Sequence, residues 1–151
     1  MRPVRLDHVS VTCADLDRSL GFYRDVLGLP LLDRGEDGGP EMERLTGLPG
    51  ARFLWAELDL GGGQILELLR YLEPAGRPLA QRTSDPGSGH LALLVDDVAA
   101  FHARLAAAGV ATRSDEPVLV TGFGGWVGVK VLYALDPDGV TVELVERPES
   151  R

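Results

Sequence analysis

The sequence predicts an α+β protein built from two tandem modules, each with the order strand, helix and then three strands. Two observations support this: alternating apolar segments flank one helical pattern in each half of the chain, and the second half repeats motifs of the first. Nineteen glycines and ten prolines favour many turns and short elements over a helical bundle. We expect one domain, residues 1–151, with module one at 4–70, a linker at 71–88 and module two at 89–147.

Module one begins with an alternating strand at residues 4–12, VRLDHVSVT. A helix follows, for which Asp15 is a suitable N-cap and Gly28 a suitable left-handed end. Strands are predicted at 30–35, 51–60 and 64–72, and the turn GGG joins the last two. Residues 35–50 resemble a loop with one helical turn around EMERL. The predicted buried face of the helix comprises Leu16, Leu20, Tyr23 and Leu27.

Module two begins after residues 71–88, whose Pro, Gly, Ser and Asp content is typical of a linker with room for one short helix. A strand at 89–95, GHLALLV, precedes a helix at 96–110 that ends at Gly109. A strand with its loop is expected at 111–120, and a hairpin with DPDG as its turn at 126–146. The predicted buried face of this helix comprises Val98, Phe101, Leu105 and Ala108.

The internal repeat identifies four residues. HVSVTCADL aligns without a gap with HLALLVDDV, so that His8 matches His90. The modules also end alike, with QILELL in the first and VTVELV in the second, which places Glu67 and Glu143 in corresponding last strands. Each module therefore opens its first strand with a histidine and sets a glutamate in its last.

These residue types favour a metal site. A carboxylate among Ile and Leu is costly if unpaired, and two facing carboxylates repel one another. One divalent cation would offset the negative charges of Glu67 and Glu143, and His8 and His90 would complete a set of four metal ligands. Mixed nitrogen and oxygen ligands suit Zn, Ni, Co, Mn or Fe(II), and the sequence does not select among them. On a six-coordinate ion, two positions would stay open for water or substrate.

Simpler interpretations exist for each residue alone. A strand histidine can be held by a local hydrogen bond, and a strand glutamate can face solvent on an edge strand. Trp55, Phe123 and Trp126 are candidates for lining a substrate pocket, or they fill the core. The glycine-rich GFGGWVGV lacks the Lys-Ser/Thr and helix of a phosphate-binding loop, so a flexible loop before a strand is expected.

The segments LDHVSVTCADLDRSLGFYRDVLGL, ILELL, GHLALLVDDV and LYALDPDGVTVELVE together resemble the vicinal oxygen chelate superfamily over roughly residues 4–147. That superfamily includes glyoxalase I, methylmalonyl-CoA epimerase, extradiol dioxygenases and the fosfomycin and bleomycin resistance proteins. The resemblance implies paired βαβββ modules, a mixed sheet curved into a cup and helices outside it. It also implies that His8, Glu67, His90 and Glu143 occupy the four metal-ligand positions.

The ligand set, by the same resemblance, bears on the activity. Extradiol dioxygenases do not use the position of Glu67, and bleomycin-type binders lack the set, so an acidic residue there favours the epimerase and glyoxalase I branches. We expect a metal-dependent isomerase or epimerase that abstracts an α-proton through a metal-bound enolate of a bidentate oxygenated substrate, with Glu67 and Glu143 as catalytic bases. The alternatives are a glyoxalase I-like lyase, a non-catalytic natural-product or antibiotic-binding protein, and an extradiol dioxygenase.

Composition limits the partners. A formal net charge of −8 without a basic cluster disfavours nucleic acid and anionic membranes, leaving a small molecule as the expected partner. The N-terminal sequence lacks an apolar targeting segment, and Cys13 is the only cysteine, so we expect a cytoplasmic protein without an intrachain disulfide. Resemblance implies a homodimer, with the cup built within one chain or between two.

Overall fold

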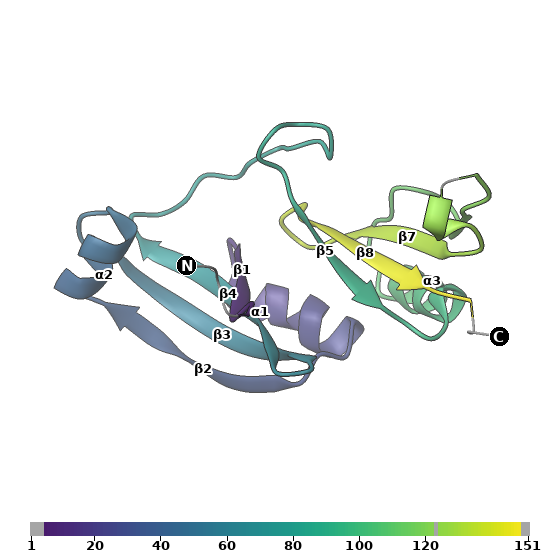
Figure 1. Cartoon of the computed structure of the whole chain (residues 1–151). Helices are drawn as coiled ribbons and strands as arrows, with labels where there is room; N and C mark the ends of the chain where they lie inside the picture. Colours follow the sequence, from purple (N-terminus) through teal and green to yellow (C-terminus); the bar gives the residue numbers. More distant parts are fainter. Residues whose placement is uncertain (1–4, 123, 149–151) are drawn as a thin grey trace. The chain divides into compact units, whose positions relative to one another are not determined.

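The structure, a computed structural model, describes residues 5–122 and 124–148. Two compact units make up the chain, Met1–Leu79 and Ala80–Arg151. Each unit contains one four-stranded mixed sheet, with the helices α1 and α2 in unit 1 and α3 in unit 2 (Figure 1), which confirms the predicted α+β class. Within the described residues, no helix has the length and apolar character needed to cross a membrane.

Unit 1 is built on the strand order β1-β4-β3-β2. Its strands are β1 (His8–Thr12), β2 (Leu31–Gly38), β3 (Arg52–Gly61) and β4 (Gln64–Glu73). β1 runs parallel to β4, whereas β4 with β3 and β3 with β2 are antiparallel. Gly61 at the end of β3 and the two glycines that follow it, Gly62 and Gly63, all have positive φ, which explains why the predicted GGG turn is made only of glycine.

The helix of unit 1 is capped as predicted but is not uniform. α1 (Leu16–Leu20) begins after Asp15, whose carboxylate accepts from the backbone N–H of Arg18 at 2.9 Å. From Gly21 to Val26 the chain widens into a π-helix, with Leu27 N–H donating to Phe22 O at 2.9 Å. The predicted face is buried at every position, and Gly28 (φ 85) ends the helix: Leu16, Leu20, Tyr23 and Leu27 are 2%, 1%, 0% and 6% exposed.

The two faces of the unit 1 sheet differ in what covers them. Leu58, Leu66, Leu68 and Ala56 are 0% exposed and lie on the face that contacts α1, which we call the helix face. The opposite face, which we call the open face, includes His8 of β1 and Glu67 of β4. The buried layer between α1 and the sheet therefore leaves the candidate site residues on the other side.

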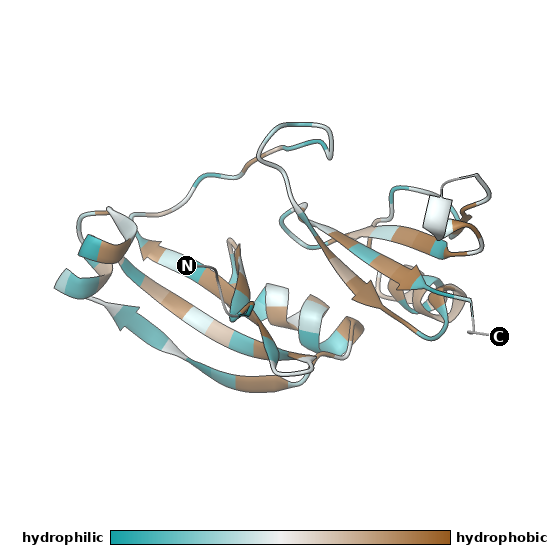
Figure 2. Cartoon of the chain, viewed as in Figure 1, coloured by the Kyte–Doolittle hydropathy of each residue, from teal (hydrophilic) through white to brown (hydrophobic). Residues whose placement is uncertain are grey.

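The segment 35–50 is more ordered than predicted. β2 continues to Gly38, and α2 (Pro40–Thr46) follows it. Pro40 at the helix start presets a helical φ, and Gly47 (φ 70) provides the left-handed end. The full length of β2 was not predicted because β2 is an edge strand with few apolar residues, and Figure 2 shows it as largely hydrophilic.

Unit 2 repeats this order with shorter elements. Its strands are β5 (His90–Leu94), β6 (Val118–Leu119), β7 (Lys130–Leu135) and β8 (Thr141–Glu146), arranged β5-β8-β7-β6 with β5 parallel to β8. Hydrophobic residues run along β5, β7 and β8 (Figure 2). The predicted DPDG turn joins β7 to β8: Asp136 Oδ1 accepts from the N–H groups of Asp138 and Val140 at 2.9 and 2.7 Å.

α3 (Val98–Ala107) is the unit 2 counterpart of α1. Asp97 caps it by accepting from Ala99 N and Ala100 N, both at 2.9 Å. Val98 and Leu105 are fully buried, but Ala108 is exposed because the helix ends one residue before it, so its predicted place on the buried face was wrong. Residues 74–89 between the sheets, all described, contain no helix, and β4 reaches Glu73 inside the predicted linker.

Candidate functional site

The first candidate pair, His8 and Glu67, lies on the open face of unit 1. In the parallel pairing of β1 with β4, His8 is the partner of Ile65 and Ser10 that of Glu67, so the two side chains are diagonal neighbours. His8 Nε2 is 3.8 Å from Glu67 Oε2. The side chains are 48% and 24% exposed, so a small ion or ligand can reach both.

Asp7 controls the other ring nitrogen of His8. His8 Nδ1 and Asp7 Oδ1 are 3.0 Å apart. This hydrogen bond raises the pKa of His8 above its ordinary value; burial opposes the rise, and Glu67, Asp7 and Glu57 add to it through their charges. A carboxylate on Nδ1 fixes the tautomer and leaves Nε2 as the acceptor, which is the usual arrangement of a metal-binding histidine.

The second candidate pair, His90 and Glu143, repeats this geometry in unit 2. His90 is the partner of Thr141 and Ala92 that of Glu143, the same register as in unit 1. His90 Nε2 is 3.1 Å from Glu143 Oε2, and the glutamate side chain is only 9% exposed. Burying a carboxylate is costly unless the group is paired, and the imidazole of His90 is the neighbouring polar partner of Glu143.

Tyr133 borders the second pair. It lies directly across from Glu143 in the β7–β8 pairing, and its ring centroid is 5.7 Å from that of His90. Burial raises the pKa of the Tyr133 phenol, and the charge of Glu143 raises it further. The phenol therefore stays protonated at neutral pH and can donate a hydrogen bond beside the pair.

Donor spacing within each pair suits a divalent ion. Nitrogen and oxygen ligands about 2.1 Å from one ion lie about 3.0 Å apart at a right angle and about 3.4 Å apart at a tetrahedral angle. The 3.1 Å of the second pair falls in this range, and the 3.8 Å of the first pair reaches it with a small side-chain adjustment. Each pair thus fits as two neighbouring ligands of one ion.

Neither pair is a complete site. Among residues 5–122 and 124–148, no three or more His, Cys, Asp or Glu side chains are gathered so that they could hold a metal ion. The structure brings His8 to Glu67 and His90 to Glu143, and it describes the two units separately. The four-ligand set expected from the sequence therefore stays a prediction.

Trp55, one of the three predicted pocket residues, lies on the same open face as the first pair. It is the partner of Leu69 on β4 and of Gly35 on β2, and it is half-buried. A Cβ added at Gly35 would come within 2.7 Å of the indole Cζ2, so the ring lies across this glycine. The indole thus forms a flat apolar surface on the open face, and its role in binding stays a prediction.

Trp126 and Phe123 belong to the glycine-rich segment of unit 2. Trp126 ends the short 3-10 helix Gly124–Trp126, and the guanidinium of Arg147 lies 5.0 Å from the centre of its ring. The segment is closed by hydrogen bonds between Val120 and both Gly128 and Val129. Phe123 lies outside the described residues, so its predicted role in the pocket stays untested.

Three site residues were not assigned a role from the sequence. Asp7 directly precedes His8, but the second module has Gly89 at the matching position, so the repeat did not point to it. Glu57 is the cross-strand partner of Glu67 as Tyr133 is of Glu143. The GGG and DPDG turns set these two registers, and counting back from each turn could have found both residues.

Comparison with known proteins identifies the family. The model of the Glyoxalase/Bleomycin resistance protein/Dioxygenase superfamily matches residues 5–144. A 2-epi-5-epi-valiolone epimerase from Actinomyces sp is 34% identical over 149 residues, covering 96% of this chain and 80% of the relative. A lactoylglutathione lyase from Haemophilus influenzae is 29% identical over 145 residues, covering 95% and 93%.

Solved structures agree with the sequence comparison. A glyoxalase family protein from Bacillus cereus superposes with a TM-score of 0.80 at 23% identity, covering 97% of this chain and 95% of that one. At this identity the likeness concerns the fold alone, and it supports the paired arrangement of strand, helix and three strands. With the family model covering nearly all described residues, the chain belongs to the Glyoxalase/Bleomycin resistance protein/Dioxygenase superfamily.

Proposed function

We propose that this protein is a metal-dependent isomerase or epimerase that moves a proton on the carbon next to a carbonyl group. One observation carries the proposal: both units place a histidine Nε2 against a glutamate Oε2 at the same strand register. A histidine that only stabilised its own unit would not require the same glutamate partner at the same register in the other unit. Repetition at matched positions is instead what two halves of one chemical site require.

His8, Glu67, His90 and Glu143 would hold the ion, Zn, Ni, Co, Mn or Fe(II), within one chain or between two copies of it in a homodimer. When bound, the ion supplies Lewis-acid chemistry, polarising a substrate oxygen and acidifying the neighbouring C–H. Asp7 would hold the His8 ring through Nδ1 so that Nε2 stays available.

Glu67 and Glu143 are the candidate bases. A carboxylate oxygen of one would accept the α-proton, and the same or the other glutamate would return it, on the same face of the carbon or the opposite one. Tyr133, held protonated by its surroundings, would donate a hydrogen bond to a substrate oxygen. Two bases on separate strands suit an epimerisation, because that reaction requires proton transfer on both faces.

The relatives support this class of chemistry and leave one close alternative. One relative is an epimerase and several are lactoylglutathione lyases, at 29–34% identity. A glyoxalase I-like lyase would use the same four residues and differ in its substrate, a glutathione adduct. Both reactions begin with loss of a proton next to a carbonyl, so the two candidates share the first experiment.

Metal stoichiometry tests the ligand set. The purified protein should contain about one divalent ion per complete site by elemental analysis, and His8→Ala and His90→Ala should each lose it. His102→Ala is the matched control, because His102 lies on the helix α3 and belongs to neither candidate pair. Equal metal content in all three variants would remove the proposed ligands.

Solvent exchange tests the reaction. Metal-loaded protein in D2O should exchange the α-proton of an α-hydroxyketone, observed by proton NMR. Glu67→Gln and Glu143→Gln should each slow exchange by about 100-fold or more, the size typical of losing a general base. Full exchange activity in both variants, with metal retained, would contradict the assignment of the bases.

A further inference from the structure

The open face of unit 1 carries charge of one sign. Strand alternation and the register of β2, β3 and β4 place five carboxylates on it: Asp33, Asp37, Glu57, Asp59 and Glu67. His8 is the only titratable nitrogen among the strand residues of this face. The strand residues around the first pair are therefore predominantly acidic.

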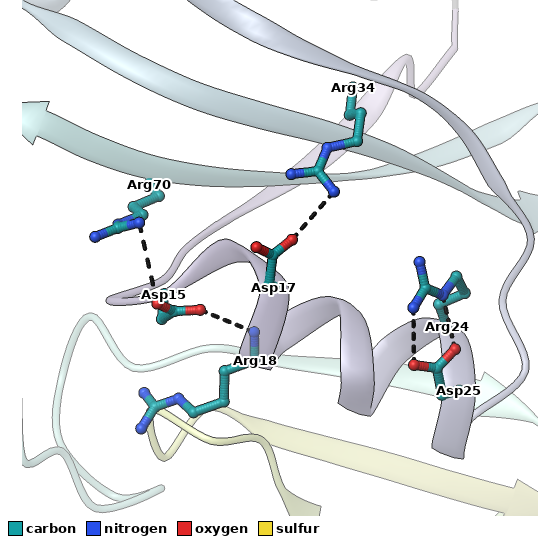
Figure 3. A network of polar contacts seen from close by, with 7 residues as sticks. All are labelled: Asp15, Asp17, Arg18, Arg24, Asp25, Arg34 and Arg70. Carbon is teal, nitrogen blue, oxygen red and sulfur yellow. Dashed lines mark hydrogen bonds and ion pairs between the residues drawn. The ribbon is translucent and has the colours of Figure 1, made fainter.

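The arginines of the same strands all lie on the helix face. Arg34 is the partner of Ala56 and reaches Asp17 on α1 at 3.1 Å; Arg70 is the partner of Leu54 and approaches Asp15 at 4.0 Å. Figure 3 shows both guanidiniums directed at the carboxylates of α1. Arg52, the third, pairs with Glu36 and Glu73. These cations are engaged on the far side of the sheet from His8 and Glu67.

Glu57 has the central position among the carboxylates. It lies directly between Asp33 on β2 and Glu67 on β4 in the cross-strand row. The side chain is half-buried, and among the described residues its carboxylate has no hydrogen bond or ion pair. Its oxygens are thus free to accept hydrogen bonds from a ligand at the first pair.

Beside Glu57 lies the indole of Trp55, two residues along the same strand and on the same face. A carboxylate next to an aromatic surface suits a molecule with several hydroxyl groups, since the carboxylate accepts O–H bonds and the ring covers C–H bonds. It does not suit a phosphate or carboxylate, because each like charge within about 7 Å weakens binding several-fold.

We propose that Glu57 determines specificity, selecting uncharged polyhydroxylated ketones and rejecting anionic ones. The inference rests on the proposed function, since it names the substrate class of that site. An ion held by two histidines and two glutamates would have its charge offset by those glutamates, so Glu57 would stay uncompensated. Glutathione and coenzyme A conjugates, which are anionic, would then be poor substrates.

A matched pair of ligands tests the proposal: xylulose and xylulose 5-phosphate, which differ by one phosphate. Dissociation constants are measured by calorimetry on the full chain, loaded with the ion found by metal analysis or, if it binds none, as purified. Xylulose should bind at least about 10-fold more tightly. In Glu57→Gln, binding of xylulose should weaken about 5-fold and binding of xylulose 5-phosphate should strengthen about 3-fold. The preference for xylulose over its phosphate would then fall to near unity.

Two variants control for charge and shape. Asp25→Asn removes the same charge on the helix side, where Asp25 pairs with Arg24 at 2.7 Å, and should leave the preference unchanged. Glu57→Asp keeps the charge on a shorter side chain, so it should still reject the phosphate while binding xylulose less tightly. Raising the salt concentration should strengthen phosphate binding in the wild type and should do so less in Glu57→Gln, which has one carboxylate fewer on the open face.

Several results would overturn the proposal. One is a preference for xylulose over its phosphate that changes less than twofold in Glu57→Gln. Another is a wild-type protein that binds xylulose 5-phosphate more tightly than xylulose. A third is tighter binding of the cationic 1-amino-1-deoxyfructose than of xylulose. Loss of proton exchange in Glu57→Gln with unchanged dissociation constants would make Glu57 a base and also refute it. Failure of the proposed function appears separately, as absent α-proton exchange with all ligands.

Discussion

Gly35→Ala tests the packing of Trp55 on the open face. The added Cβ would lie 2.7 Å from Cζ2 and 2.9 Å from Cε2 of the indole, against a contact distance of about 3.5–4.0 Å between carbons. Overpacking of this size costs about 1–3 kcal/mol. In the absence of the contact, the same change in a strand would stabilise by about 0.5–1 kcal/mol, because alanine loses less backbone entropy than glycine. The sign of the effect is therefore diagnostic.

Urea unfolding followed by circular dichroism gives the free energy of unfolding. The matched control is Gly21→Ala, where φ is −55° and an added Cβ has nothing within 4 Å, so stability should rise by about 0.5–1 kcal/mol. Trp55→Leu combined with Gly35→Ala should recover most of the loss, since the ring is removed. A stabilised Gly35→Ala protein, or an unrecovered double variant, would refute the placement of the indole.

Three further predictions follow from local hydrogen bonds. In metal-free protein, Asp7→Asn should lower the pKa of His8, measured by NMR titration, and an unchanged pKa would contradict the Asp7 bond. Because folding raises the pKa of His8, the stabilising contribution of this histidine is full at acidic pH and is lost as pH rises through the folded pKa. Asp97→Ala removes two cap bonds of α3 and should cost about 1 kcal/mol in urea unfolding, whereas no loss would argue against the cap. The hydrogen bonds from Lys130 and from the N–H of Val98 lower the pKa of Glu146. The stability that Glu146 contributes should therefore be present at neutral pH and lost as pH falls through its folded pKa. In Glu146→Gln, the free energy of unfolding should depend less on pH in the acidic range.

Most elements were predictable because their signals are local. Asp15, Gly28, Gly109 and the DPDG turn act within a few residues of themselves, and the structure confirms each as a cap, an end or a turn. The π-helical turn after Gly21 was not predictable, because its widened hydrogen bonds depend on packing against the sheet rather than on residue type. The length of β2 was missed for a related reason, since an edge strand is stabilised by pairing with β3 and not by its own apolar pattern.

The candidate site was predictable to the extent that the chain repeats itself. His8 with Glu67, and His90 with Glu143, were paired from the repeat alone, and each pair is adjacent in its unit. Asp7 and Glu57 were not assigned because module two has Gly89 and Tyr133 at the matching positions. Comparing the two modules identifies residues that both contain, and it gives no signal for residues that only one of them contains.

This difference between the units is itself informative about chemistry. The shared residues, a histidine and a glutamate in each unit, can supply a symmetric donor set, but a symmetric set alone would treat the two ends of a substrate alike. Unit 1 adds Asp7, Glu57 and further carboxylates to its pair, whereas unit 2 adds the neutral phenol of Tyr133 and buries Glu143 more deeply than unit 1 buries Glu67. An isomerase or epimerase must fix which carbon loses its proton. For the proposed isomerase or epimerase, the carboxylates around the first pair would provide such a distinction, because they would favour the hydroxyl-rich part of a substrate over its apolar part.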